Sequence, residues 1–216
     1  MIYLQENSPF PPVKLADEDG LLALGGSLTS ERLMTAYRSG IFPWFNENQP
    51  VLWWSPDPRM VLYPENFKAS KSLIQKINNN HFSVTFNVAF AKVIKACAEI
   101  KRNNETGTWI TPGMQEAYNE LHHLGHAVSV EVWKESELVG GLYGIDLPKQ
   151  KIFCGESMFH KETDASKIAF YHLVEKLKFN SYKLIDCQVY NKHLESLGAQ
   201  EISRVLFVSI LTKEAQ

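Results

Sequence analysis

Apolar residues beyond position 61 follow two spacings that alternate along the chain. Leu73, Ile74 and Ile77 share one face of a helix expected over residues 70–80, and residues 90–100 repeat that spacing. Between them, residues 81–87 alternate apolar and polar positions as a strand does. Downstream, strands are expected over 126–133, 138–145, 152–154, 184–189 and 205–210, and helices over 112–124, 164–179 and 191–197. Strands and helices in this order predict an α+β fold, in which helices flank a mixed sheet.

Three glycines interrupt the second strand of the hairpin expected between residues 126 and 145. They are Gly140, Gly141 and Gly144. Glycine inside a strand often marks a bulge or the close approach of another group to the backbone. We therefore expect one of these two features in this strand.

The first 61 residues lack the regular alternation of helices and strands that is expected beyond them. This difference predicts a small N-terminal domain over 1–61 and a larger domain over 62–216. Three tryptophans of this segment, Trp44, Trp53 and Trp54, fall within eleven residues of expected loop. Large rings of this kind can form the core of a small domain. They can also form a surface on which nucleobases stack. Both interpretations remain open from the residues.

Two polar residues stand inside the apolar strand expected over 184–189. Asp186 and Gln188 are two positions apart, so on an extended strand they project to the same face. A buried carboxylate needs hydrogen-bond partners, and the Gln188 amide can donate to Asp186 while its carbonyl accepts from another group. The pair is either a structural bond within the sheet or an acceptor pair that holds an amine.

A second acid, Glu156, lies between apolar residues in the segment FCGESMF, next to Gly155, which permits a close approach to the backbone. A carboxylate in such a setting is neutralised unless a cation accompanies it. One interpretation is a buried ion pair with Lys167 or Lys183. The other is an anionic pocket for a cationic group of a ligand.

Composition excludes several classes of function. The 216 residues are 44% hydrophobic and carry a formal charge of −2, which is enough for a full core but gives no support for a broad nucleic-acid surface. Apolar runs are short and no secretory signal is visible, so no membrane span is expected. Three cysteines without a CxxC pair indicate a reduced, cytoplasmic protein.

Motifs for several common chemistries are missing. The sequence contains no GxxxxGK[ST] loop, no GxGxxG after a strand and no GxSxG elbow. Three histidines, His122, His123 and His126, invite a metal site, but Gly125 should end their helix before His126, so no metal is expected. An enzyme of this kind needs a substrate that arrives already activated.

Ten short motifs occur in a fixed order between about Asp19 and Arg204. They are GLLALGG, GIFPWF, LWWSPDPR, GTWIT, EVW, LVGGLYG, FCGESMF, ASK, LIDCQ and HLESLGAQEISR. Together they resemble the bacterial leucyl/phenylalanyl-tRNA–protein transferases over nearly the whole chain. The resemblance implies a small N-terminal domain followed by a GNAT-like acyltransferase domain. It also implies transfer of Leu, or of Phe and less often Met, from aminoacyl-tRNA to the α-amino group of proteins with N-terminal Arg or Lys, which marks them for degradation.

The resemblance gives roles to the polar residues. Gln188 would accept a hydrogen bond from the attacking amine, while Asp186 orients and polarises its amide. Glu156 would receive the cationic N-terminal residue or orient the terminal ribose, and Trp44 would stack on the 3′-adenine. Because glutamine is a poor base, the identity of the group that removes the amine proton stays open, and the tRNA ribose hydroxyl is one candidate to share this transfer. No cofactor is implied, since an aminoacyl ester is already activated.

The remaining expectations concern binding. An apolar pocket for the leucyl side chain is implied for Trp109, Leu142, Phe153, Gly155, Met158, Leu173 and Ile185. Weak candidates for contact with the tRNA acceptor stem are Lys68, Lys71 and Lys76. The partners implied are aminoacyl-tRNA and proteins with N-terminal Arg or Lys, with no membrane, and the protein is expected to be a monomer.

Two other classes of protein compete with this interpretation. A GNAT-type N-acetyltransferase would use acetyl-CoA, but a glycine-rich pyrophosphate loop before a helix is not evident. A non-catalytic module that binds tRNA or protein N-termini would use nearly the same residues. Labelled leucyl-tRNA and acetyl-CoA, each offered with an Arg-initiated peptide, would discriminate among the three.

Overall fold

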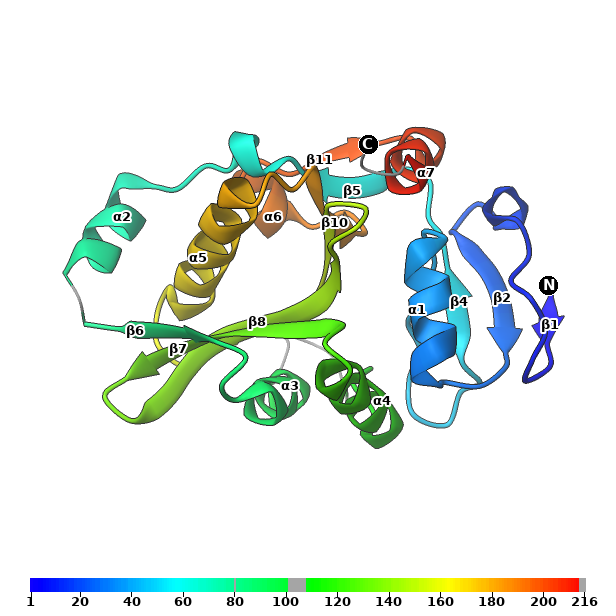
Figure 1. Ribbon diagram of the computed structural model, residues 1–216, viewed down its shortest axis with the longest axis horizontal. Coiled ribbons are helices and arrows are strands. Elements are labelled where there is room, and N and C mark those ends of the chain that lie inside the picture. The colour runs from blue at the N-terminus through cyan, green and yellow to red at the C-terminus, as the bar shows by residue number, and fades with distance from the viewer. Residues whose placement is uncertain (80, 101–107, 214–216) are drawn as a thin grey trace.

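The computed structural model describes residues 1–79, 81–100 and 108–213, and these contain two separate sheets. The smaller sheet belongs to the N-terminal part of the chain. Its strands, in spatial order, are β1 (Tyr3–Leu4), β2 (Leu21–Gly25), β4 (Leu52–Trp54) and β3 (Phe42–Pro43). The same part of the chain contains a short 3₁₀ helix, η1 (Val13–Leu15), and helix α1 (Ser30–Arg38) (Figure 1).

The larger sheet holds seven strands within the described ranges. In spatial order they are β11 (Gln200–Ile202), β5 (Arg59–Leu62), β10 (Leu184–Gln188), β9 (Ile152–His160), β8 (Glu137–Leu147), β7 (Ala127–Lys134) and β6 (Ser83–Phe86). Strand β10 runs parallel to β9, whereas β5 and β8 pair with these two strands in the antiparallel direction. The sheet is therefore mixed, and the predicted α+β fold with a small N-terminal domain is confirmed.

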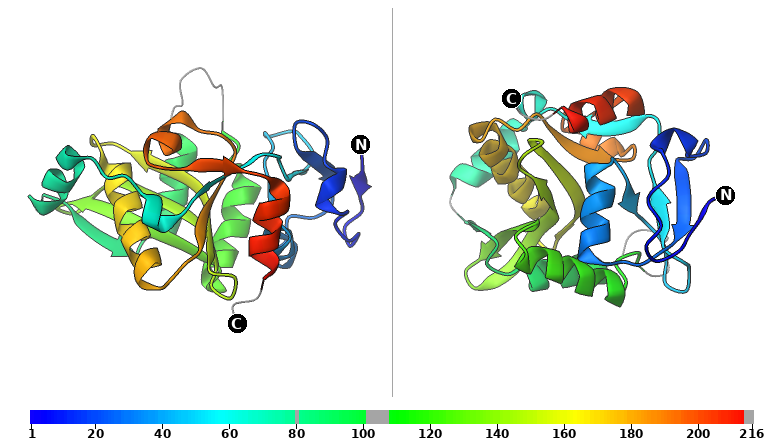
Figure 2. Two further views of the ribbon diagram at one scale, coloured as in Figure 1. Left: turned by 90° about the horizontal axis from the view of Figure 1, so that it is seen from above. Right: turned by 45° about the vertical axis from the view of Figure 1, so that its right-hand side comes forward.

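Helices cover both faces of the larger sheet (Figures 1 and 2). On one face lies α5 (Ala165–Phe179), with α2 (Lys71–Asn78) beside it, and on the other lie α3 (Phe90–Glu99) and α4 (Pro112–His123). Each face buries its own apolar core, and the core under α3 and α4 continues into the N-terminal domain. The remaining helices are η2 (Pro64–Asn66), α6 (Lys192–Ser196) and α7 (Arg204–Thr212). Residue 80, the expected end of the helix over 70–80, lies outside the described residues.

The strand expected over 205–210 is wrong, because this segment is helix α7. Its run of apolar residues has no alternation that separates a strand from a buried helix. Two features make it helical. The side chain of Ser203 caps the helix by accepting the N–H of Leu206, and Phe207 and Leu211, four residues apart, are buried on one face. The last strand is instead the short β11, immediately before the cap.

The boundary between the two parts of the chain lies close to β5. This strand belongs as a whole to the larger sheet, where Arg59 and Met60 already pair with β11. Sheet membership therefore changes between Trp54 and Arg59, a few residues before the predicted division at 61/62. That division itself stays a prediction.

The glycines of β8 have the role expected from the sequence. A Cβ on Gly140 would lie 2.5 Å from the Cβ of Ala165 on α5, so glycine lets the helix pack directly on the strand. A Cβ on Gly144 would lie 2.2 Å from the carbonyl oxygen of Cys154, beside a register shift between β8 and β9. Both expected features, the close approach and the bulge, are therefore confirmed.

Among the helices of the described segments, none has the length and apolar character needed to cross a membrane.

Candidate active site

A cavity of about 1000 Å³ opens where β9 and β10 separate. The two strands pair in parallel only as far as Cys154 and Asp186. Beyond this point β9 remains paired with β8, while β10 no longer pairs with β9 and leads into α6. The segment between β3 and β4, from the N-terminal domain, forms another wall of the cavity.

The cavity gathers every residue that the sequence suggested for catalysis or for binding of the aminoacyl group. These residues are Trp44, Trp109, Leu142, Phe153, Gly155, Glu156, Met158, Leu173, Ile185, Asp186 and Gln188. They come from both domains and from β8, β9, α5 and β10. Apolar side chains form one part of the wall, and the three polar residues lie together in another.

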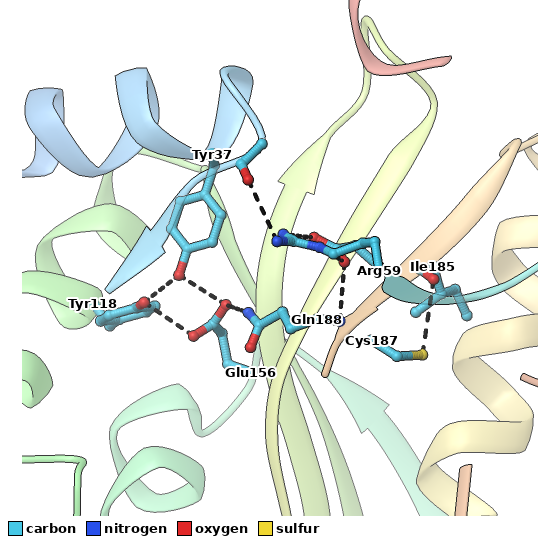
Figure 3. A network of polar contacts seen from close by, with 9 residues as sticks. Tyr37, Arg59, Tyr118, Glu156, Ile185, Cys187 and Gln188 are labelled. Atoms are coloured by element: carbon cyan, nitrogen blue, oxygen red, sulfur yellow. Dashed lines mark hydrogen bonds and ion pairs between the residues drawn. The ribbon is translucent and has the colours of Figure 1, made fainter. Parts of the chain in front are cut away.

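Asp186 is held by a buried ion pair with Arg59. The Arg59 Nε and Nη2 atoms donate to the two carboxylate oxygens at 2.8 and 2.7 Å, and both side chains are about 1% exposed. The guanidinium lies between the rings of Phe42 and Phe207, each 4.7 Å from its Cζ (Figure 3 shows Arg59). Asp186 is therefore compensated within the fold and is fixed in one orientation.

Gln188 follows Asp186 across a bulge. Asp186 pairs with Val61 and Gln188 with Met60, so Cys187 is the additional residue, and Gln188 has a left-handed φ of 66°. The bond expected between the two side chains does not form. Asp186 instead accepts the backbone N–H of Gln188 at 3.0 Å, and the Gln188 side chain turns toward β9.

Glu156 receives that side chain and two tyrosine hydroxyls (Figure 3). Its Oε1 accepts from Gln188 Nε2 at 2.8 Å and from Tyr37 Oη at 2.7 Å, and its Oε2 accepts from Tyr118 Oη at 3.0 Å. The two hydroxyls are also hydrogen-bonded to each other. The partners of Glu156 are thus neutral donors from α1, α4 and β10.

A lysine partner for Glu156, one of the two interpretations of its sequence setting, is wrong. Lys167 donates to Asp164, and Lys183 donates to the carbonyl of Lys213. Since neutral donors replace a cation, the ionised carboxylate lacks full charge compensation.

Burial raises the pKa of Glu156 to about 7, and the nearby charge of Asp186 adds to this effect. Hydrogen bonds from Tyr37, Tyr118 and Gln188 act in the opposite direction, because they stabilise the ionised form. Burial and the charge of Glu156 also raise the pKa of both tyrosines well above the ordinary value, so both hydroxyls are neutral near pH 7. A carboxyl with a pKa near 7 can exchange a proton at physiological pH.

The tryptophan cluster divides between the core and the cavity wall, and the stacking of a nucleobase on it stays a prediction. Trp53 is fully buried, and its Nε1 donates to the carbonyl of Gly25, so it belongs to the core. Trp44 is 43% exposed on the cavity wall. The indole of Trp54 supports it by donating to its carbonyl at 2.7 Å. A flat ring is therefore presented to the cavity on a fixed backbone.

The three lysines suggested for tRNA contact are not part of this arrangement. Among the described residues that line the cavity, Lys68, Lys71 and Lys76 do not occur. Lys68 and Lys71 are exposed, and Lys76 pairs with Asp164 at 3.2 Å. Their contact with tRNA stays a prediction.

The histidines of α4 have structural contacts. His122 stacks on Phe90 with ring centroids 4.3 Å apart, and its Nδ1 lies 2.8 Å from the carbonyl oxygen of Ala127. Within the described parts of the chain, no group of three or more His, Cys, Asp or Glu side chains is arranged to hold a metal ion.

Three residues of the site were missed from the sequence: Arg59, Tyr37 and Tyr118. Arg59 ends the motif LWWSPDPR and begins a buried strand. A buried arginine needs an acid as its partner, and Asp186 was a buried acid without one, so this match was the signal that could have found Arg59. The tyrosines lie on the apolar faces of their helices, where a tyrosine is indistinguishable from an ordinary core residue. Only the contacts of their hydroxyls with Glu156, which the structure shows, identify them as residues of the site.

Comparison with known proteins places this geometry in a family. The family model of leucyl/phenylalanyl-tRNA protein transferase matches residues 61–212, and the model of the N-terminal domain of that family matches residues 26–57. The leucyl/phenylalanyl-tRNA–protein transferase of Christiangramia forsetii is 58% identical over 211 residues, which are 98% of this chain and 100% of that protein. The corresponding protein of Syntrophobacter fumaroxidans is 56% identical over 97% of this chain and 89% of that protein.

Among solved structures, a GCN5-related N-acetyltransferase from Kribbella flavida aligns with 79% of this chain and 60% of that chain, at 7% identity and a TM-score of 0.41. A likeness of this degree carries no information about substrate.

An amide positioned by a partly buried carboxyl beside an apolar slot suits an enzyme that moves an acyl group onto an amine, and the matches define an aminoacyltransferase. More narrowly, the chain belongs to the leucyl/phenylalanyl-tRNA–protein transferase family. An aminoacyl-tRNA is accordingly the donor and a protein the acceptor.

Proposed function

We propose that the protein transfers leucine, and also phenylalanine and less often methionine, to the α-amino group of proteins that begin with arginine or lysine. The added residue then marks the acceptor for degradation. The observation that supports this most directly is the position of Gln188. Its amide N–H is engaged by Glu156, so its carbonyl oxygen is the part left to accept a hydrogen bond in the cavity.

The protein promotes aminolysis by holding the attacking amine in position against the ester. Gln188 Oε1 accepts an N–H of the incoming amine and directs its lone pair toward the ester carbonyl. Asp186 holds the backbone of Gln188 through the N–H bond at 3.0 Å, and Arg59 holds Asp186. The donor needs no nucleotide triphosphate, because the ester linkage to tRNA is already activated.

The leucyl side chain occupies the apolar part of the cavity. Phe153, Leu173 and Ile185 are buried there, and Met158 adds an adaptable side chain. An apolar pocket separates side chains that differ by one methylene by only about 1–3 kcal/mol. Selection of leucine over phenylalanine and methionine is therefore a preference and not an exclusion.

Trp44 is proposed to stack on the terminal adenine of the tRNA. Trp44→Ala should raise the KM for leucyl-tRNA by roughly fivefold to a hundredfold, because stacking of a base on an aromatic ring contributes about 1–3 kcal/mol. Steady-state kinetics with leucyl-tRNA as the varied substrate measure this. The exposed Tyr3 in β1 of the same domain offers a matched control, and Tyr3→Ala should leave the KM unchanged. An unchanged KM in Trp44→Ala would remove the stacking role.

Direct assay tests the function as a whole. Labelled leucyl-tRNA and an Arg-initiated peptide should yield a Leu-Arg N-terminus, whereas the same peptide with an acetylated α-amine should stay unlabelled. Transfer from acetyl-CoA to the peptide, without transfer from leucyl-tRNA, would establish an N-acetyltransferase. Binding of both substrates without a product would establish a binding module.

We propose further that the enzyme acts as a monomer in the cytoplasm, where aminoacyl-tRNA is available.

A further inference from the structure

The cluster of Tyr37, Tyr118 and Glu156 contains more oxygen–oxygen contacts than its two hydroxyl hydrogens can fill. Three oxygen–oxygen contacts are present, namely Tyr37 to Glu156, Tyr118 to Glu156 and Tyr37 to Tyr118 (Figure 3). Each contact needs one hydrogen, and each neutral hydroxyl brings one. With an ionised Glu156 the cluster is one hydrogen short, and a protonated Glu156 supplies the third.

With that third hydrogen the cluster closes into a ring. Glu156 Oε2 then donates to Tyr118, Tyr118 donates to Tyr37, and Tyr37 donates to Glu156 Oε1. The bond from Gln188 Nε2 to Oε1 is compatible with both protonation states, because Oε1 accepts in each. The cluster can thus gain or lose a proton without releasing Gln188.

Among the described groups in and around the cluster, only Glu156 can gain and lose a proton near neutral pH. Burial raises the pKa of Tyr37 and Tyr118, as it does the pKa of the Cys154 thiol beside Glu156 on β9, so these groups keep their hydrogens. Tyr143 of β8 faces Tyr118 edge to ring at 5.6 Å, and from β10 the charge of Asp186, paired with Arg59, acts on Glu156. Glu156 is the group of this cluster that titrates near neutrality.

We propose that Glu156 is the group that takes the proton from the attacking amine, and that Tyr37 and Tyr118 are positioning residues that hold this proton in a closed ring. The proposal rests on the function proposed above and identifies the base that Gln188 cannot be. A carboxylate offers about four acceptor positions, and the chain's donors occupy three, so one position on Oε2 is left for the incoming ammonium.

The step balances as follows. The acceptor arrives as an ammonium with three N–H hydrogens, and one proton moves to the vacant position on Glu156 Oε2. This O–H then turns toward Tyr118 while the Tyr118 hydroxyl turns toward Tyr37, which closes the ring. The neutral amine attacks the ester carbonyl carbon, the C–N bond forms and the C–O bond to the ribose breaks. One hydrogen stays on the new amide, one passes to the departing ribose oxygen, and the third remains on Glu156 until it is released to solvent. An α-ammonium has a pKa of about 8, so a carboxyl with a pKa of about 7 is well matched to receive its proton.

The test is the pH dependence of kcat at saturating leucyl-tRNA and peptide. The wild type should lose activity as the pH falls through about 7, because Glu156 is then already protonated. Tyr37→Phe and Tyr118→Phe remove bonds from both forms of Glu156. The bond lost by the ionised carboxylate is charge-assisted and therefore stronger than each neutral bond of the ring, and the net effect of each hydroxyl is to lower the pKa of Glu156. Each variant should move the acid limb upward by about one pH unit, with a roughly fivefold loss at pH 7 and recovery at higher pH.

A matched control and a second measurement make the outcome decisive. Tyr182→Phe removes a comparable hydroxyl–carboxylate bond to Asp146 outside the cluster and should leave the acid limb in place. In protein labelled with ¹³C at glutamate Cδ, one resonance should titrate near pH 7 and be missing in Glu156→Gln, whatever the activity of the variants. Two results would overturn this proposal and leave the proposed function standing. One is an acid limb that stays in place in both phenylalanine variants, and the other is the absence of a glutamate that titrates near pH 7. Absence of leucine transfer by the wild type would overturn the proposed function with it.

Discussion

Asp186→Ala should lower the free energy of unfolding by about 3–5 kcal/mol, because it leaves the buried guanidinium of Arg59 without its carboxylate. Arg59 is about 1% exposed, and its other contacts are the rings of Phe42 and Phe207 and the carbonyl of Gly40 at 3.4 Å. None of these is an anion. Urea unfolding of the variant and the wild type measures the difference. Turnover should also fall, and by a larger factor than the affinity for leucyl-tRNA.

A double variant separates the two effects of this substitution. Arg59→Met combined with Asp186→Leu removes both charges and keeps apolar volume, so most of the lost stability should return. Turnover should remain low, because the backbone N–H of Gln188 still lacks the acceptor that fixes it. Recovery of turnover together with stability would show that Asp186 acts only through the fold. A single variant as stable as the wild type would contradict the buried pair.

The sequence predicted those elements whose apolar residues follow one clear spacing. Helix α5 is of this kind, since the helical periodicity of its apolar residues extends over the whole element. In β7, Val128, Val130 and Val132 alternate with the polar residues Ser129 and Glu131. The end of the chain is different. The segment that forms α7 is a continuous apolar run compatible with either element. The true strand β11 has only three residues, of which Gln200 and Glu201 are exposed.

Within the site, the sequence indicated polar residues that interrupt apolar strands. Asp186, Gln188 and Glu156 stand out because a buried polar group needs an explanation. Their partners could not be found in this way. Tyr37 lies 119 positions from Glu156 and Arg59 lies 127 from Asp186, and no local pattern links residues so far apart.

The bulge at Cys187 is a second reason why the geometry differs from expectation. A regular strand would place Asp186 and Gln188 on one face, but one additional residue turns the Gln188 side chain away from Asp186. The run LIDCQ contains neither glycine nor proline to mark this irregularity. The bulge is visible only from the pairing of β10 with β5.

Gln188→Ala should reduce kcat by roughly 10²–10³-fold, in the range seen when one positioned polar group of an active site is removed. The KM for leucyl-tRNA should stay nearly constant, because the proposed role of Gln188 is contact with the amine and not with the tRNA. The fold should be retained with a loss of about 1 kcal/mol, since Glu156 keeps its bonds from Tyr37 and Tyr118. Single-turnover transfer with preformed enzyme–leucyl-tRNA complex measures the chemical step.

Gln188→Asn provides the matched control for this prediction. Asparagine tolerates the left-handed backbone at this position and carries the same amide, but its side chain is one methylene shorter. It cannot both donate to Glu156 and present its carbonyl at the position that Gln188 Oε1 occupies. We therefore expect it to be nearly as slow as the alanine variant, with a stability close to that of the wild type. Transfer by Gln188→Ala within about twofold of the wild type would show that the amide is not the acceptor of the amine N–H, and full activity of Gln188→Asn would show that its position is not what matters.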